Sequence, residues 1–122
     1  MSSERPDPVL ISELRESVSR IEEYLVGHSV GSFRADMRTR DAVCMRLIVI
    51  GEAANRLTDD GKARLPHLNW DGMAGLRHML AHDYGAASPS LLWSIVTVSV
   101  PQLADALSQL PEDSCSSPSS PP

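Results

Sequence analysis

The densest group of reactive side chains lies between residues 77 and 84, where the sequence reads RHMLAHDY. Arg77 supplies a permanent cation, and His78 and His82 supply imidazoles that titrate near neutral pH. A guanidinium can neutralise the charge that grows on phosphorus during phosphodiester cleavage, while a histidine takes the proton of an RNA 2′-hydroxyl or protonates the departing 5′-oxygen. This chemistry needs no metal ion and no cofactor. The same residues would also suit the polar end of a helix without a catalytic role.

A metal site is an alternative interpretation of the two histidines. His78 and His82 are four residues apart, so on a helix they would share one face and could reach one ion. The helical zinc-protease motif has a glutamate directly after its first histidine, whereas Met79 stands at that position here. We therefore expect no metal at this site.

The spacing of Arg77 and His82 sets a geometric condition on any shared chemistry. Five residues correspond to about 140° around a regular α-helix, so the two side chains do not point the same way. Either the long arginine stem wraps around the helix, or a second copy of the chain supplies the missing group across a two-fold axis. The second solution predicts a homodimeric site.

Four amphipathic helices are predicted to position this cluster, in an all-α antiparallel bundle. Asp7 is expected as the N-cap of the first, with Pro8 at its first position, and Ser88 as the N-cap of the fourth. Pro101 should kink the fourth helix or divide it in two. The helices are expected near residues 7–27, 36–57, 70–84 and 88–110. Their apolar positions recur at intervals of three and four residues and include Ile11, Leu14, Val18, Ile21, Val43, Leu47, Ile50, Met73, Leu76, Leu80, Leu92, Val96, Val100, Leu103 and Leu107.

Composition fits one helical domain over residues 7–110, with a flexible start at 1–6 and a disordered Ser/Pro-rich tail at 111–122. The net charge of −5 argues against a protein that coats nucleic acid through its overall field, so any such contact must be local. The two cysteines do not suggest a disulfide framework, and no export signal or membrane span is indicated. A cytoplasmic location is expected.

The order Arg77, four residues, His82, one residue and Tyr84 resembles the Arg-x4-His-x-Tyr motif of HepT-like toxins in the HEPN superfamily. The surrounding sequence is similar as well. Further matching segments are Asp41-Ala42-Val43, Ile50-Gly51-Glu52-Ala53-Ala54, Pro66 to Trp70, Leu92-Trp93-Ser94-Ile95-Val96 and Pro101-Gln102-Leu103. Two positions depart from the family pattern: His78 stands where a small polar residue is usual, and Met45-Arg46 stands where relatives often have arginine and then asparagine.

The resemblance implies a helical domain that dimerises with its two motifs facing one cleft. It implies a metal-independent endoribonuclease acting as the toxin of a type VII-like toxin–antitoxin system. Arg77 would then bind phosphate and stabilise the transition state, His82 would act as general acid or base, and His78 would be auxiliary. Arg46 would contact RNA. The implied partner is a minimal nucleotidyltransferase antitoxin that transfers AMP to Tyr84, placing negative charge and bulk beside Arg77.

Glu52 also requires an explanation, because it lies in the most apolar helix of the first half of the chain. If it is buried it needs a partner, and Arg77 is the candidate, held by charge-assisted hydrogen bonds. Exposure at the helix surface is the alternative for Glu52. For the whole chain, the alternative to a nuclease is a non-catalytic helical dimer that binds a nucleotide or a nucleotidyltransferase through the same cleft.

Overall fold

The structure is a computed structural model that describes residues 6–65 and 67–111. Within these ranges the chain is helical and has no β-strand, which confirms the predicted all-α class. In chain order the elements are α1 (Asp7–Leu25), α2 (Val30–Ala35), α3 (Met37–Arg56), α4 (Asp59–Ala63), α5 (Trp70–His82), the 3₁₀ helix η1 (Tyr84–Ala86), α6 (Pro89–Ser94), the π-helical segment η2 (Ile95–Ser99) and α7 (Val100–Ser108).

The predicted flexible ends lie mostly outside the described residues. Only Pro6 and Pro111 of those two segments are described, and both are exposed. The predictions for the remainder of residues 1–6 and 111–122 therefore stay predictions. Cys115 lies outside the described residues too, whereas Cys44 is a buried free thiol.

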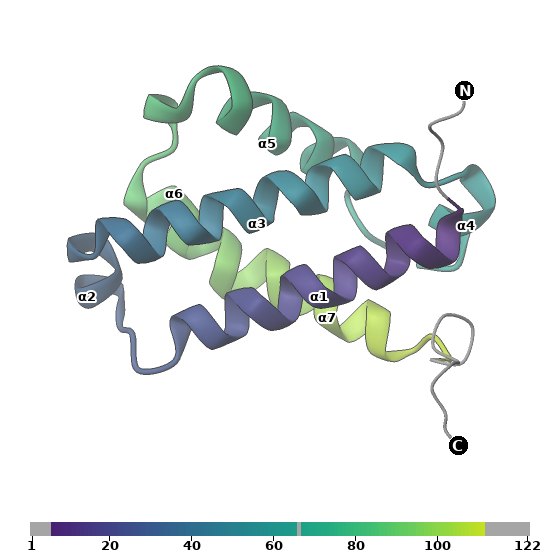
Figure 1. The fold of residues 1–122 in the computed structure, drawn as a ribbon, viewed down its shortest axis with the longest axis horizontal. Helices are drawn as coiled ribbons and strands as arrows, with labels where there is room; N and C mark the ends of the chain where they lie inside the picture. The colour runs from purple at the N-terminus through teal and green to yellow at the C-terminus, as the bar shows by residue number, and fades with distance from the viewer. Residues whose placement is uncertain (1–5, 66, 112–122) are drawn as a thin grey trace.

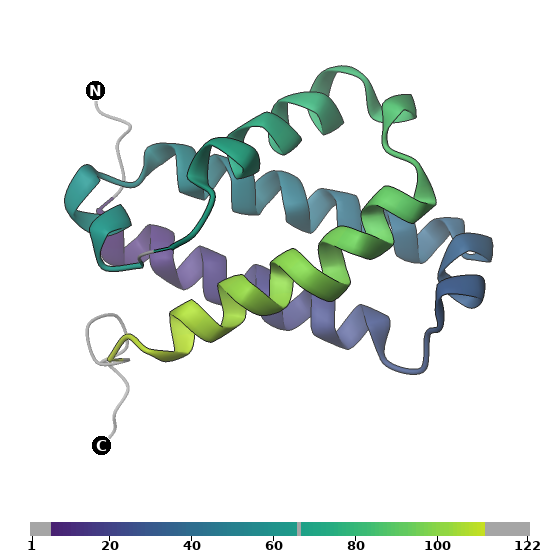
Figure 2. The ribbon, with the colours of Figure 1, turned by 180° about the vertical axis from the view of Figure 1, so that it is seen from behind.

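Helix α3 is the central element of the fold. It runs antiparallel beside α1 on one side and α5 on the other, and Figure 1 shows all three. The segment from α6 to α7 crosses the opposite face, where α6 contacts α2 and α7 contacts α1 (Figure 2). Because α5 packs mainly on α3, it does not close tightly against α7 as a fully closed four-helix bundle would require.

The start of α1 corrects one detail of the sequence analysis. Asp7 is the first helical residue rather than the N-cap, and that position is occupied by Pro6. The Asp7 carboxylate accepts hydrogen bonds from the backbone N–H of Thr58, at 3.1 Å, and from the Thr58 hydroxyl. Since its oxygens serve Thr58, Asp7 ties the start of α1 to the turn that opens α4.

The core consists of the apolar stripes that the spacing predicts. The buried members come from every long helix, but α5 contributes only Leu80 to the fully buried set. Its Met73 and Leu76 are only partly buried and pack against the edge of the core. The apolar side chains with the least exposure are Leu10, Leu14, Ile21, Phe33, Val43 and Leu65.

Pro101 disturbs the last helix on its N-terminal side. The proline has no N–H to donate, and its ring collides with the carbonyl four residues earlier in a regular α-helix. The structure accommodates it with the π-helical segment Ile95–Ser99, whose wider turn directly precedes α7. The chain therefore continues as one helical rod from Pro89 to Ser108 (Figure 2), so of the two outcomes expected at Pro101, a kink or a division, the division does not occur.

An apolar cavity of about 420 Å³ lies between α5 and the α6–α7 rod. Its walls include Met73, Leu76 and Met79 from α5 and Leu91, Ile95 and Leu103 from the rod. By length and composition alone the rod could also cross a membrane, a test that a core helix passes as well. Only 28% of its most apolar stretch is buried, but most of its exposed positions are polar, and the large apolar side chains exposed along it are Leu91 and Val98.

Candidate functional site

Gly51 sets the distance between α3 and α5. A Cβ atom at this position would overlap the Cβ of Arg77 and would lie 2.9 Å from the backbone oxygen of Met73. Real Cβ atoms do not approach backbone this closely, so only glycine permits the observed crossing. As a result, the base of the Arg77 side chain lies directly against α3.

Glu52, the next residue of α3, pairs with Arg77. Its Oε2 forms an ion pair with Nη2 of Arg77, and its Oε1 lies 3.4 Å from Nε of Arg56. The side chains of Arg77 and Glu52 are 34% and 35% exposed, so Glu52 is neither buried nor fully at the surface. The pairing suggested by the sequence is therefore present, and one carboxylate joins two guanidinium groups.

This arrangement orients Arg77 without enclosing it. Among the described residues, the buried Nε of Arg77 has no hydrogen-bond partner. The cluster has a net charge of +1, because it contains the guanidinium groups of Arg56 and Arg77 and the carboxylate of Glu52. A phosphate group could bind Arg77 from the solvent side, because a guanidinium offers five N–H donors and Glu52 engages only part of that set.

The histidines occupy a different face of α5. His78 and His82 are both exposed, and their ring centroids are 4.5 Å apart with the planes tilted by 45°. Since α5 remains helical to His82, Arg77 and His82 project about 140° apart around its axis. The structure thus brings His78 and His82 together, but it does not bring either imidazole to the Arg77 guanidinium within one chain.

Tyr84 is held by α3 near the end of α5. Helix α5 runs antiparallel to α3, so its C-terminal end lies above the first turns of α3 (Figure 1). The Tyr84 hydroxyl donates a hydrogen bond to Oδ1 of Asp41, although the ring is 49% exposed. This bond to a carboxylate raises the pKa of Tyr84 to about 12, with a smaller effect of burial. Tyr84 is therefore accessible and neutral at physiological pH.

Arg46 lies on the other side of α3. Its Nη1 donates to the hydroxyl of the fully buried Ser17 at 3.4 Å. It lines a polar groove of about 730 Å³ between α1 and α3, together with Arg20 and Glu16 of α1 and with Glu52 and Arg56 further along α3. The predicted RNA contact by Arg46 remains a prediction, but the cation that shares a carboxylate with Arg77 is Arg56.

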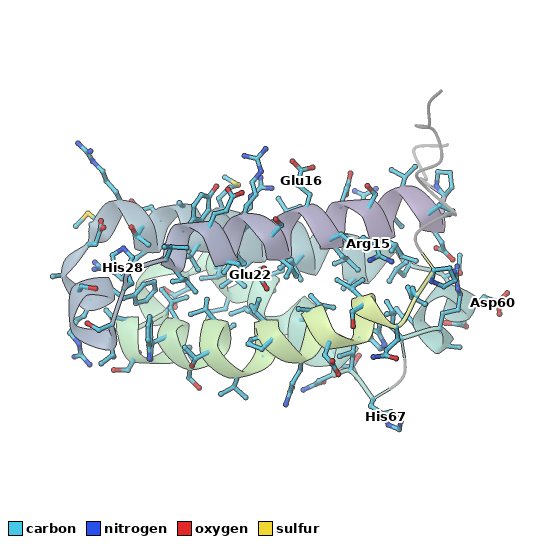
Figure 3. All side chains as sticks on the ribbon, turned by 90° about the horizontal axis from the view of Figure 1, so that it is seen from below. Arg15, Glu16, Glu22, His28, Asp60 and His67 are labelled. Carbon is cyan, nitrogen blue, oxygen red and sulfur yellow. The ribbon has the colours of Figure 1, made fainter. Side chains whose placement is uncertain are left out.

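The two remaining histidines lie outside α5. His28 lies at the turn after α1, at the left of Figure 3, and His67 lies on the connector before α5, at the lower right of that view. His28 contacts Asp36 and Ser32, which organise the loop between α1 and α3. Within residues 6–65 and 67–111, no group of three His, Cys, Asp or Glu side chains is placed to hold a metal ion.

Sequence reasoning assigned no role to Asp41 or Arg56. The position of Arg56 four residues after Glu52 is a helical ion-pair spacing that could have pointed to it. Asp41 is separated from Tyr84 by 43 positions in the sequence. No local pattern indicates that contact, which depends on how α5 crosses α3.

Comparison with known proteins agrees with the geometry. A family model described as "Ribonuclease HepT-like" matches residues 14–110. The chain belongs to this HepT-like family of the HEPN superfamily, which confirms the resemblance seen in the Arg-x4-His-x-Tyr motif.

Among its relatives is "Putative RNase MJ1380" of Methanocaldococcus jannaschii. It is 31% identical over 101 residues, covering 83% of this chain and 93% of the relative. "Probable ribonuclease HepT" of Thermococcus cleftensis is also 31% identical, over 76% of this chain and 84% of that protein. No solved structure matches the chain at a comparable level.

Proposed function

We propose that this protein is a metal-independent endoribonuclease that acts as a homodimer. The support comes from its membership of the HepT-like family, from relatives named as ribonucleases, and from the placement of Arg77 and His82. Arg77 binds the scissile phosphate and stabilises the charge of the transition state. The RNA 2′-oxygen bonds to phosphorus as the bond to the 5′-oxygen breaks, and His82 transfers a proton as general acid or base. His78 is auxiliary to His82.

The dimer is inferred from one observation: the side chains of Arg77 and His82 diverge on the same regular helix, α5. Glu52 and Gly51 fix Arg77 against α3, whereas His82 points away from that helix into solvent. A second copy related by a two-fold axis can place its own Arg77 opposite His82, and symmetry then makes the same contact twice.

The uncovered apolar side of α5 supports a dimer on this face. Met79 and Gly75 line the cavity between α5 and the α6–α7 rod, and they lie three and seven residues before His82, on the same side of the helix. Leu91 of the rod, which also lines this cavity, is exposed. A second copy that covered these apolar groups would bring its own side chains to His82.

Tyr84 is the proposed point of control. It is accessible, it lies two residues after His82, and it matches the tyrosine of the family motif. We propose that a nucleotidyltransferase antitoxin transfers AMP to its oxygen and so inactivates the toxin. The added charge would compete with RNA for the region around Arg77.

Cleavage by the purified protein tests the activity. The wild-type chain is expected to cleave RNA in the presence of EDTA and to leave 2′,3′-cyclic phosphate ends. Arg77→Ala and His82→Ala should each abolish cleavage. Cleavage that persists equally in both variants would refute the proposed roles.

Mixing the two inactive variants tests the shared site. In a heterodimer of Arg77→Ala and His82→Ala chains, one of the two sites keeps an intact arginine and an intact histidine. Random exchange of subunits should then restore about a quarter of wild-type activity, because half of the dimers would be mixed and each would hold one complete site. If each site were formed within one chain, mixing would restore nothing.

A further inference from the structure

The hydrogen bond between Tyr84 and Asp41 has no part in the chemistry proposed above. Its acceptor lies in the first half of α3, far from Tyr84 in the sequence. Cys44, which is 3% exposed, lies one turn further along α3 and its thiol also interacts with the phenol. Tyr84 thus sits against α3 with a charged acceptor and a buried thiol.

The hydrogen bond between Tyr84 and Asp41 lies beside the C-terminal end of α5, which carries His82. Leu80 is the last buried side chain of α5, and residues 81–86 are all exposed. No buried side chain therefore anchors the stretch that carries His82. Its backbone turns through hydrogen bonds from Asp83 N to Met79 O, at 2.7 Å, and from Ala86 N to Asp83 O, at 2.9 Å. Among the described contacts, the Tyr84 hydroxyl is the side-chain group that ties this stretch to α3.

We propose that Asp41 is a positioning residue for His82, acting through Tyr84, and that modification of the Tyr84 oxygen releases this end of α5. The inference rests on the proposed nuclease function. Transfer of AMP from a nucleoside triphosphate forms a bond between the Tyr84 oxygen and the α-phosphorus, breaks the bond to the β-phosphate, and releases pyrophosphate and the phenolic proton.

The modified oxygen can no longer donate to Asp41. It carries instead a phosphodiester, whose negative charge faces the Asp41 carboxylate and is repelled by it. The phenol would leave its place on α3, and His82 would lose the contact that fixes its position. Modification would thus inactivate the site by removing a support, in addition to occupying space near Arg77.

Arg77 should be insensitive to this change. Its anchors are Gly51 and Glu52, near the middle of the α3–α5 contact and separate from the Tyr84–Asp41 bond. Loss of that bond should therefore lower kcat, which depends on proton transfer by His82, and leave the KM for RNA unchanged. Partial unfolding would also lower the apparent kcat at constant KM, because fewer molecules would be active, so each variant must show intact helix by circular dichroism.

Tyrosine ionisation tests the hydrogen bond directly. The chain has only two tyrosines, so a Tyr24→Phe background reports Tyr84 alone. At about pH 11, where an ordinary tyrosine is mostly ionised, Tyr84 should remain largely neutral by its absorbance. Adding Asp41→Asn should make it largely ionised while circular dichroism shows intact helix. Equal ionisation in both proteins would overturn the proposal.

Hydrogen exchange and kinetics test the positioning role. In Tyr84→Phe and Asp41→Ala, the amides of residues 83–87 should exchange faster and kcat should fall about tenfold with unchanged KM, since a small misplacement of a catalytic group can cost this much. Asp41→Asn, whose amide oxygen can still accept a hydrogen bond, should keep more activity than Asp41→Ala. Tyr24→Phe and Asp105→Asn are the matched controls and should behave as wild type.

A double variant separates one shared contact from two independent effects. Tyr84→Phe combined with Asp41→Ala should be no worse than either single variant, because both remove the same bond. Additive losses, or a rise in KM equal to the fall in kcat, would overturn the positioning role. A wild-type chain that cleaves no RNA would refute the proposed function instead, and ionisation and exchange would still decide whether Asp41 holds Tyr84.

Discussion

Gly51 and Arg77 meet at the closest approach of α3 and α5, with no room for a methyl group between them. The next residue, Glu52, then reaches the guanidinium of the same arginine. Gly51 and Glu52 of α3 therefore affect Arg77 in two separate ways. The glycine determines how near the motif helix lies, and the glutamate determines where its cation points.

Gly51→Ala should destabilise the protein because the new methyl group overlaps Arg77 and the Met73 carbonyl. Overpacking of this kind typically costs about 1–3 kcal/mol of the free energy of unfolding, and urea denaturation measures it. Gly31→Ala is the control, since a Cβ there meets only the Ser29 hydroxyl, at 3.9 Å. Equal stabilities of the two variants would show that the helices can move apart at no cost.

Glu52→Gln should lower kcat clearly, while it should change the free energy of unfolding only slightly. The Arg77–Glu52 pair is about one-third exposed, so its loss should cost about 1 kcal/mol or less. Arg77 would lose its charged anchor while remaining free to bind phosphate, and KM should not rise. Glu16→Gln, which removes the exposed pair with Arg20, is the matched control and should leave kinetics unchanged. A large rise in KM with constant kcat would contradict this role.

Arg56→Ala should weaken RNA binding more than Arg46→Ala does. Arg56 shares Glu52 with Arg77, whereas Arg46 faces Ser17 on the α1 side. If Arg56 contacts a backbone phosphate, its removal should reduce the salt dependence of log Kd by about one unit of slope. Binding curves at several salt concentrations measure it. Since Arg46 and Arg56 both line the α1–α3 groove, a larger effect of Arg46→Ala would place the RNA nearer to Ser17 than to Glu52.

Asp36 should contribute to stability only above acidic pH. Hydrogen bonds from Thr39 hold the pKa of Asp36 below its ordinary value of 3.8. A lowered folded pKa means that the contribution is complete above the unfolded pKa and is lost as the pH falls through the folded one. Asp36→Ala, which removes the N-cap of α3, should lower Tm at neutral pH and have less effect at pH 2. Thermal melts of the two proteins at both pH values measure the difference, and an equal loss of Tm at pH 2 and at neutral pH would contradict this contribution.

The sequence predicts the helices well because each one has a periodic apolar stripe and a recognisable start. Asp36 and Ser88 cap α3 and α6 within the expected regions. The divergence of Arg77 and His82 also follows from helical geometry alone, once α5 stays regular to its end. These features are local, and local patterns encode them.

The missed features all depend on how helices cross. Asp41 meets Tyr84 only because α5 returns antiparallel along α3, and Asp7 meets Thr58 because α4 folds back under α1. The partial burial of Met73 and Leu76 arises because α5 leans on α3 and leaves a cavity towards the α6–α7 rod. Their spacing matches that of core residues, and spacing cannot report how far a neighbouring helix lies.

The π-helical segment Ile95–Ser99 also determines the helical phase of the rod, that is, which residues of α7 face the core. Each residue turns an α-helix by about 100°, so the wider turn determines which side of α7 meets the core. The π-helical turn holds one residue more than an α-helical turn, so deleting the exposed Val98 would convert it to a regular turn and leave Leu103 and Leu107 facing the core. A deletion within α7 has no extra residue to absorb it and would rotate everything that follows, so it should be far more damaging than the loss of that valine.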